Sequence, residues 1–176
     1  MKWNRIKTKL GVTKVATHVG FIPENPATES FKSLVNSIRY LANYYKKNGQ
    51  YFLFETGQET PITLLRTIEE VGCDNLGINL DPSNLLSYGK GNPIDALGIF
   101  GKYVMDVHAK DGRYPTTGTK NGCQTHLGEG MVDYPRFIAR LKEIGYDDTL
   151  IIEREISGEQ QIKDIAAGKI FLEKLI

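Results

Sequence analysis

The chain has 176 residues, of which 40% are hydrophobic and 24% are charged, as is usual for a globular protein with one core. Lys and Arg number 22 against 21 Asp and Glu, so a net charge of +1 offers no strong attraction to nucleic acid or to an anionic membrane. We therefore expect one domain over residues 1–176, with no nucleic-acid and no membrane partner.

The segment MKWNRIKTKLGV has basic residues but no apolar stretch of the kind found in a signal peptide, and no later apolar run approaches the length of a membrane span. Cys73 and Cys123 stand outside any CxxC spacing, which argues against a zinc site or a disulfide framework built on cysteine. These features predict a cytoplasmic protein.

Short apolar runs alternate with amphipathic segments, a pattern typical of βα units in a parallel sheet covered by helices. Most of the runs are continuously apolar, as in strands buried on both faces. In chain order, strands are expected at TKVATHVGF from Thr13, YFLFET from Tyr51, LGINLD from Leu76, YVMDVHAKD from Tyr103 and TLIIERE from Thr149.

Five helices are expected between and after these strands. The first, in ESFKSLVNSIRYLANYYKKNG, repeats apolar residues at helical spacing and is stopped by Gly49. The next two should open where a capping side chain precedes a proline, and the last two where a capping side chain precedes an amphipathic stretch. The expected caps are Thr60, Asn92, Asp133 and Ser157.

The segment from Lys110 to Asp133, KDGRYPTTGTKNGCQTHLGEGMVD, is too long for a simple βα connection. Its content of Gly, Thr and Asn predicts a long loop. In a parallel βα protein this loop would leave the carboxyl end of its strand, where ligands bind.

Four expected strands end in a carboxylate or an imidazole, and parallel strands place their carboxyl ends at one rim. Three carboxylates and one histidine suit a hard divalent cation such as Mn²⁺, Mg²⁺, Co²⁺ or Zn²⁺ better than they suit a soft metal. Taken alone, Asp81 before Pro82 could be only a helix N-cap. Four such residues on four successive units favour a functional site. They are Glu55, Asp81, His108 and Glu153.

The segments FETGQET, GINLDPSNLL, VHAKDG, LGEG and IEREISGEQQ together resemble the sugar phosphate isomerase/epimerase proteins of the xylose-isomerase-like TIM barrel superfamily. The resemblance runs almost end to end. It implies an α/β fold, a parallel (β/α) barrel of TIM type, of which this chain supplies about five of the eight βα units. The three N-terminal βα units would be lacking.

The resemblance also implies a chemistry. One divalent cation would be held by Glu55, Asp81, His108 and Glu153, and the two glutamates would act as the acid/base pair of a sugar isomerase or epimerase in carbohydrate metabolism. The related ketose 3-epimerases have a histidine shortly after the aspartate, where this chain has Asn84, so the sugar and its phosphorylation are left open. The expected substrate-binding residues are His18, Asn84, Lys110, Asp111 and Arg113.

Two other interpretations stay open at this point. Endonuclease IV-type DNA repair enzymes share the barrel, but their histidine-rich trinuclear zinc site fits poorly with three histidines and a charge of +1. A catalytically silent barrel fragment or an oligomer-forming scaffold is the other. Five parallel strands would leave two open edges, so we also expect a homo-oligomer.

Overall fold

The computed structural model describes residues 11–176; most of the basic segment MKWNRIKTKLGV lies outside these residues. Five parallel strands form one sheet in chain order: β1 (Lys14–Thr17), β2 (Tyr51–Glu55), β3 (Leu76–Leu80), β4 (Val104–Ala109) and β7 (Leu150–Ile152). Because neighbours in sequence are neighbours in the sheet, each connection is a βα crossover. The predicted partial barrel of TIM type is confirmed.

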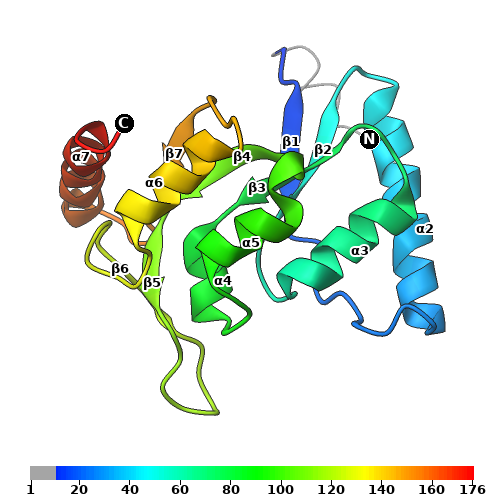
Figure 1. The fold of residues 1–176 in the computed structure, drawn as a ribbon, viewed down its shortest axis with the longest axis horizontal. Coiled ribbons are helices and arrows are strands. Elements are labelled where there is room, and N and C mark those ends of the chain that lie inside the picture. Colours follow the sequence, from blue (N-terminus) through cyan, green and yellow to red (C-terminus); the bar gives the residue numbers. More distant parts are fainter. Residues whose placement is uncertain (1–10) are drawn as a thin grey trace.

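The helices lie along one face of the sheet and at its two flanks (Figure 1). None of those in residues 11–176 has the length and apolar character needed to cross a membrane. We expected five, but α4 is a further short helix directly after β3, and its six residues are too few to show a helical repeat. The helices are α2 (Glu29–Lys46), α3 (Pro61–Val71), α4 (Pro82–Ser87), α5 (Pro93–Phe100), α6 (Tyr134–Glu143) and α7 (Glu159–Glu173), with a 3₁₀ turn, η1 (Gly101–Tyr103).

Most of the expected helix starts are confirmed. The side chains of Thr60, Asn92 and Asp133 each accept a backbone N–H from the first turn that follows. The expectation for Ser157 is wrong. Helix α7 is preceded by Gly158 at φ 87°, and no side chain caps it. A left-handed backbone angle favours glycine, which explains why the residue after Ser157 takes the N-cap position.

The two faces of the sheet are packed differently. On the helix side, Phe52 of β2 stacks on Tyr45 of α2 with ring centroids 5.4 Å apart. On the opposite, concave side, Gly77 of β3 allows Leu53 and Met105 to approach, because a Cβ there would lie 2.6 Å from the Met105 sulfur. Side chains two positions apart on a strand point to the same face of the sheet. The residues two positions after Leu53 and Gly77 therefore also point to the concave side.

The side chain of one lysine links the two edge strands of the sheet across its concave side. Lys14 of β1 donates from Nζ to the carbonyl oxygen of Met105 at 2.7 Å and forms an ion pair with Asp148, just before β7. First and last strands therefore approach one another at their amino ends. The sheet is curved like part of a barrel wall.

The long segment after β4 is not a simple loop, which corrects our expectation. It contains an antiparallel hairpin, β5 (Asp111–Arg113) paired with β6 (Cys123–Thr125), whose tip projects from the body of the molecule (Figure 1). Strands of three residues are too short to show an alternating pattern. The Asp111 side chain, 1% exposed, anchors the returning chain by accepting the backbone N–H groups of Gly112, Gly128, Gly130 and Val132.

Within residues 11–176, strands β1 and β7 each lack a second neighbouring strand, and Ile151 of β7 is 44% exposed. Unpaired edges with apolar side chains tend to pair with another chain. We expect self-association, most simply as a two-fold dimer, and expect Ile151→Lys to shift it toward monomer. Size-exclusion chromatography with light scattering measures both. A wild-type monomer at micromolar concentration that unfolds cooperatively would contradict this expectation.

Candidate metal centre

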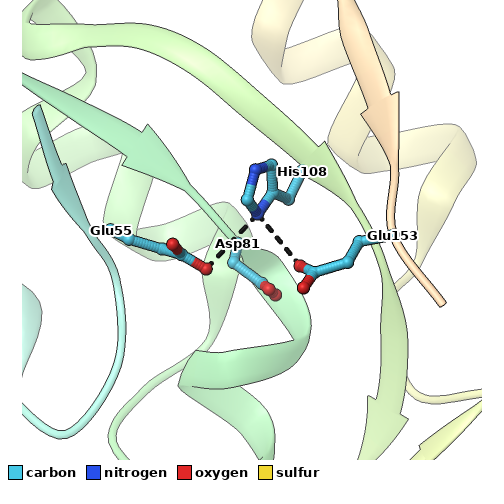
Figure 2. Close-up of side chains that lie close together, drawn as sticks. All are labelled: Glu55, Asp81, His108 and Glu153. Carbon is cyan, nitrogen blue, oxygen red and sulfur yellow. Dashed lines mark ion pairs between the residues drawn. The ribbon is translucent and has the colours of Figure 1, made fainter. Parts of the chain in front are cut away.

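Four side chains converge at the carboxyl rim of the sheet. Glu55 ends β2, Asp81 follows β3, His108 lies in β4 and Glu153 follows β7; Figure 2 shows them pointing toward one another. One ligand atom from each lies within 4.8 Å of the others. His108 Nδ1 is 3.3 Å from Glu55 Oε1 and 3.0 Å from Glu153 Oε2. The structure thus brings together the four residues that the sequence indicated.

Asp81 serves the fold and the cluster at once. Its Oδ1 accepts the backbone N–H of Asn84 at 2.9 Å and caps α4, while Oδ2 is buried in the cluster. The Thr56 hydroxyl, which sequence reasoning missed, accepts the Asp81 backbone N–H at 2.8 Å and donates to the Asp81 carbonyl at 2.8 Å. The N-cap interpretation and the cluster interpretation of Asp81 are therefore both compatible with its position.

The cluster shifts the proton affinities of its members strongly. Burial alone would raise the pKa of Glu55, but contacts with His108 and His18 lower it to about 2. Burial alone would lower the pKa of His108, but contacts with Glu153 and Glu55 raise it to about 10. Burial raises the pKa of Asp81 to about 6. An imidazolium therefore supplies positive charge among the carboxylates when no other cation is bound.

The donor set fits a hard divalent cation. Within residues 11–176, Asp81 Oδ2, His108 Nδ1 and Glu153 Oε2 are buried and form no hydrogen bond. Nδ1 and Oε2 are close enough for an ion pair, and Lys110 Nζ lies at ion-pair distance from both carboxylate oxygens, 3.3 Å from Asp81 Oδ2 and 3.5 Å from Glu153 Oε2. Buried polar atoms without hydrogen bonds are rare in native proteins and call for an explanation such as an ion. Three carboxylates and one imidazole are ligands that Mn²⁺, Mg²⁺, Co²⁺ and Zn²⁺ accept.

Asn79 of β3 orients His108 by contacting the ring nitrogen that points away from the cluster. Its buried amide lies with Nδ2 3.0 Å from His108 Nε2, while its Oδ1 is left buried without a partner among the described residues. Amide oxygen and nitrogen occupy equivalent positions, so a turned amide would accept the Nε2–H and leave the Nδ1 lone pair toward the cluster. Sequence reasoning missed Asn79. Its signal is a polar residue two positions before Asp81, hence on the same strand face.

Three of the expected substrate-binding residues lie around the cluster. His18, after β1, is half-exposed, with Nε2 3.4 Å from Glu55 Oε1. Asn84 of α4 donates from Nδ2 to the Thr56 carbonyl at 3.1 Å. Lys110, after β4, is buried with Nζ 3.4 Å from Asn84 Oδ1. All three line a small cavity beside the cluster.

The other two expected residues are directed elsewhere. Both oxygens of Asp111 accept backbone N–H groups of the returning loop, so its position favours a structural role. Arg113 is exposed and donates from its guanidinium to the Glu129 carbonyl at 2.7 Å. Neither residue lines the cavity beside the cluster.

The chain is thus a parallel partial barrel with three carboxylates and a histidine gathered at its carboxyl rim. The family model described as xylose isomerase-like TIM barrel matches residues 2–175. The chain therefore belongs to the xylose isomerase-like TIM barrel family.

Curated relatives are longer than this chain. The uncharacterized protein MJ1311 of Methanocaldococcus jannaschii is 27% identical over 179 residues, covering 92% of this chain and 56% of that protein. An inosose dehydratase of Lacticaseibacillus casei is 25% identical over 146 residues, covering 72% of this chain and 48% of that protein. The chain thus spans about half the length of these relatives.

Solved structures share the fold. A xylose isomerase domain protein from Planctomyces limnophilus superposes with a TM-score of 0.94 at 37% identity, covering 99% of this chain and 63% of that one. The IOLI protein, solved with a zinc atom, gives a TM-score of 0.79 at 20% identity, covering 99% of this chain and 68% of that one. At such identity the second likeness concerns the fold alone.

Replacing Asn79 by leucine should weaken metal binding without removing a ligand. The substitution keeps the size of the side chain but removes the group that orients His108, so we expect Mn²⁺ affinity to fall about 10- to 100-fold. Calorimetric titration of the chelator-treated protein measures this. Asn75→Leu is the matched control, because Asn75 is also a buried amide but bonds to Ala42 and Gln50 carbonyls. Equal affinities in both variants would contradict the orienting role of Asn79.

Proposed function

We propose that this chain carries the metal centre of a divalent-metal-dependent isomerase or epimerase acting on a sugar or sugar phosphate. The supporting observation is that three carboxylate oxygens and one imidazole nitrogen lie within 4.8 Å of one another. They lie at the carboxyl rim of a xylose isomerase-like barrel, where barrel enzymes have their active sites. Glu55, Asp81, His108 and Glu153 would hold one cation. When bound, it would polarise a substrate carbonyl and stabilise the negative charge that develops there.

Glu55 and Glu153 are the proposed acid/base pair. They flank His108 from opposite sides (Figure 2). The ordinary pKa of a glutamate lies well below neutral pH, so both carboxylates are expected to be ionised there and able to accept a proton. One would take the proton from the carbon next to a carbonyl.

The fate of that proton decides the reaction. Return to the same carbon from the opposite face gives an epimer, and return to the neighbouring carbon interconverts an aldose and a ketose. One relative is named an inosose dehydratase, and loss of water after the same proton removal would be a third outcome. We propose one of the first two outcomes, in which one carboxylate takes the proton and the other returns it.

A fragment without its own turnover is the second candidate. The five-stranded wall encloses the cluster from one side, and the chain spans about half the length of curated relatives. In that case, metal binding would persist while proton exchange required further residues from another polypeptide or segment. The experiment below distinguishes the two.

Glu55→Gln and Glu153→Gln should each reduce hydrogen–deuterium exchange at the α-carbon of a ketohexose by about 100-fold or more, because each removes a proton acceptor. The assay uses Mn²⁺-loaded protein and nuclear magnetic resonance. Metal content, measured on the same samples, separates loss of a base from loss of the cation. Glu173→Gln, on the exposed side of α7, is the control. Exchange that is unchanged in both variants would show that these glutamates are structural, and no exchange by metal-loaded wild type would favour the silent fragment.

A further inference from the structure

A small polar cavity of about 200 Å³ opens beside the cluster of carboxylates and His108. This is below the roughly 300–1,000 Å³ of pockets for drug-sized ligands, so it suits one small group of atoms. Its lining comes from α4, the β5–β6 hairpin, the segments that follow β4 and β7, and His18 after β1. Hydroxyl and amide groups, which both donate and accept hydrogen bonds, make up much of it: Ser83, Ser87, Tyr88, Asn121 and Gln124.

The walls of this cavity are held by backbone contacts. The Gly122 N–H donates to the Ser87 carbonyl at 2.8 Å and joins the hairpin to α4. At Gly112, a Cβ would lie 2.5 Å from the Ser83 hydroxyl oxygen, so the hairpin backbone packs directly on the helix. The spacing between these two walls is therefore fixed by the fold.

Gln124 fixes the third wall, which is the chain after β7. Its Oε1 accepts the Glu155 backbone N–H at 2.9 Å, and its Nε2 donates to the Glu153 carbonyl at 3.2 Å. The Arg154 guanidinium also donates to Gln124 Oε1, at 2.8 Å. The position of Glu155 at the cavity is thus set by the hairpin, although its side chain is 60% exposed.

The ammonium group of Lys110 is the fixed cation of the cavity, and its charge is already balanced. Its Nζ lies 2.9 Å from Glu155 Oε1, 3.3 Å from Asp81 Oδ2 and 3.5 Å from Glu153 Oε2. An incoming anion would have to displace Glu155 to gain this cation. Arg113, the other cation expected near an anionic substrate, donates to the Glu129 backbone carbonyl instead and does not line the cavity.

The formal charge of the site also disfavours an anionic substrate. With His18 neutral, the three cluster carboxylates and Glu155 contribute four negative charges, against one divalent cation and the Lys110 ammonium, which leaves −1. A phosphate group would add nearly two more negative charges in a partly buried site, where repulsion is strong. Hydroxyl groups add none.

We propose that this cavity takes the hydroxyl-bearing end of an unphosphorylated polyhydroxy ketone, and that Glu155 excludes the phosphorylated counterpart. The inference rests on the proposed function and narrows its substrate class. Lys110 and Glu155 would bond substrate hydroxyls as a pair, one donating and the other accepting, while the serine and tyrosine hydroxyls and the Asn121 amide complete the set.

The test compares D-fructose with D-fructose 6-phosphate on Mn²⁺-loaded protein by calorimetric titration, with inorganic phosphate as a third probe. We expect wild type to bind D-fructose about tenfold more tightly than its phosphate. In Glu155→Gln the preference for D-fructose over D-fructose 6-phosphate should fall about tenfold, mostly because the affinity for D-fructose 6-phosphate rises. Glu159→Gln, an exposed glutamate at the start of α7, is the matched control and should keep the wild-type ratio.

Three results would overturn the inference: equal or tighter binding of D-fructose 6-phosphate by wild type, an unchanged ratio in Glu155→Gln, or no binding of D-fructose by metal-loaded protein at about 10 mM. Metal loading is measured first. Failure to hold Mn²⁺ would reject the proposed function, whereas a metal-loaded protein that exchanges the α-proton of the phosphate alone would reject only this inference.

Discussion

Carboxylates from three different strands are held so close together that positive charge among them is a condition of the structure. Glu55, Asp81 and Glu153 each bring an oxygen to within 4.8 Å of the others, a separation at which like charges in a partly buried site repel strongly. The Lys110 ammonium supplies part of that charge, and the carboxylates favour an imidazolium at His108, whose pKa they raise to about 10 against the effect of its burial. A divalent cation would replace this proton and supply twice the charge.

The fold imposes this arrangement through groups that never enter the cluster. Thr56 holds the Asp81 backbone, Asn79 contacts the far nitrogen of His108, and Gln124 ties the Glu153 carbonyl to the hairpin. Each comes from a different element, so the cluster depends on the assembled sheet rather than on one local motif. The geometry of the site therefore depends on the barrel architecture. Hydrogen bonds from surrounding residues commonly orient metal ligands in this way.

Much of the fold could be predicted from the sequence, because buried parallel strands are continuous apolar runs and each ends in a polar residue at the rim. Glu55, Asp81 and Glu153 directly follow such runs. Asn79 could not be identified in the same way, since a polar residue inside a strand shows its partner only after folding. Gln124 acts on residues about thirty positions away through a hairpin whose strands are too short to give a pattern. Ser157 fails as a cap because Gly158 takes a left-handed backbone angle.

The central claim is that these four side chains hold one divalent cation. Elemental analysis of protein refolded with Mn²⁺ and freed of excess metal tests it most directly. We predict about one Mn²⁺ per chain for wild type and a sharp loss for Asp81→Asn, since asparagine can still cap α4 but lacks the anionic oxygen. No retained metal in wild type, or equal retention by Asp81→Asn, would contradict the account.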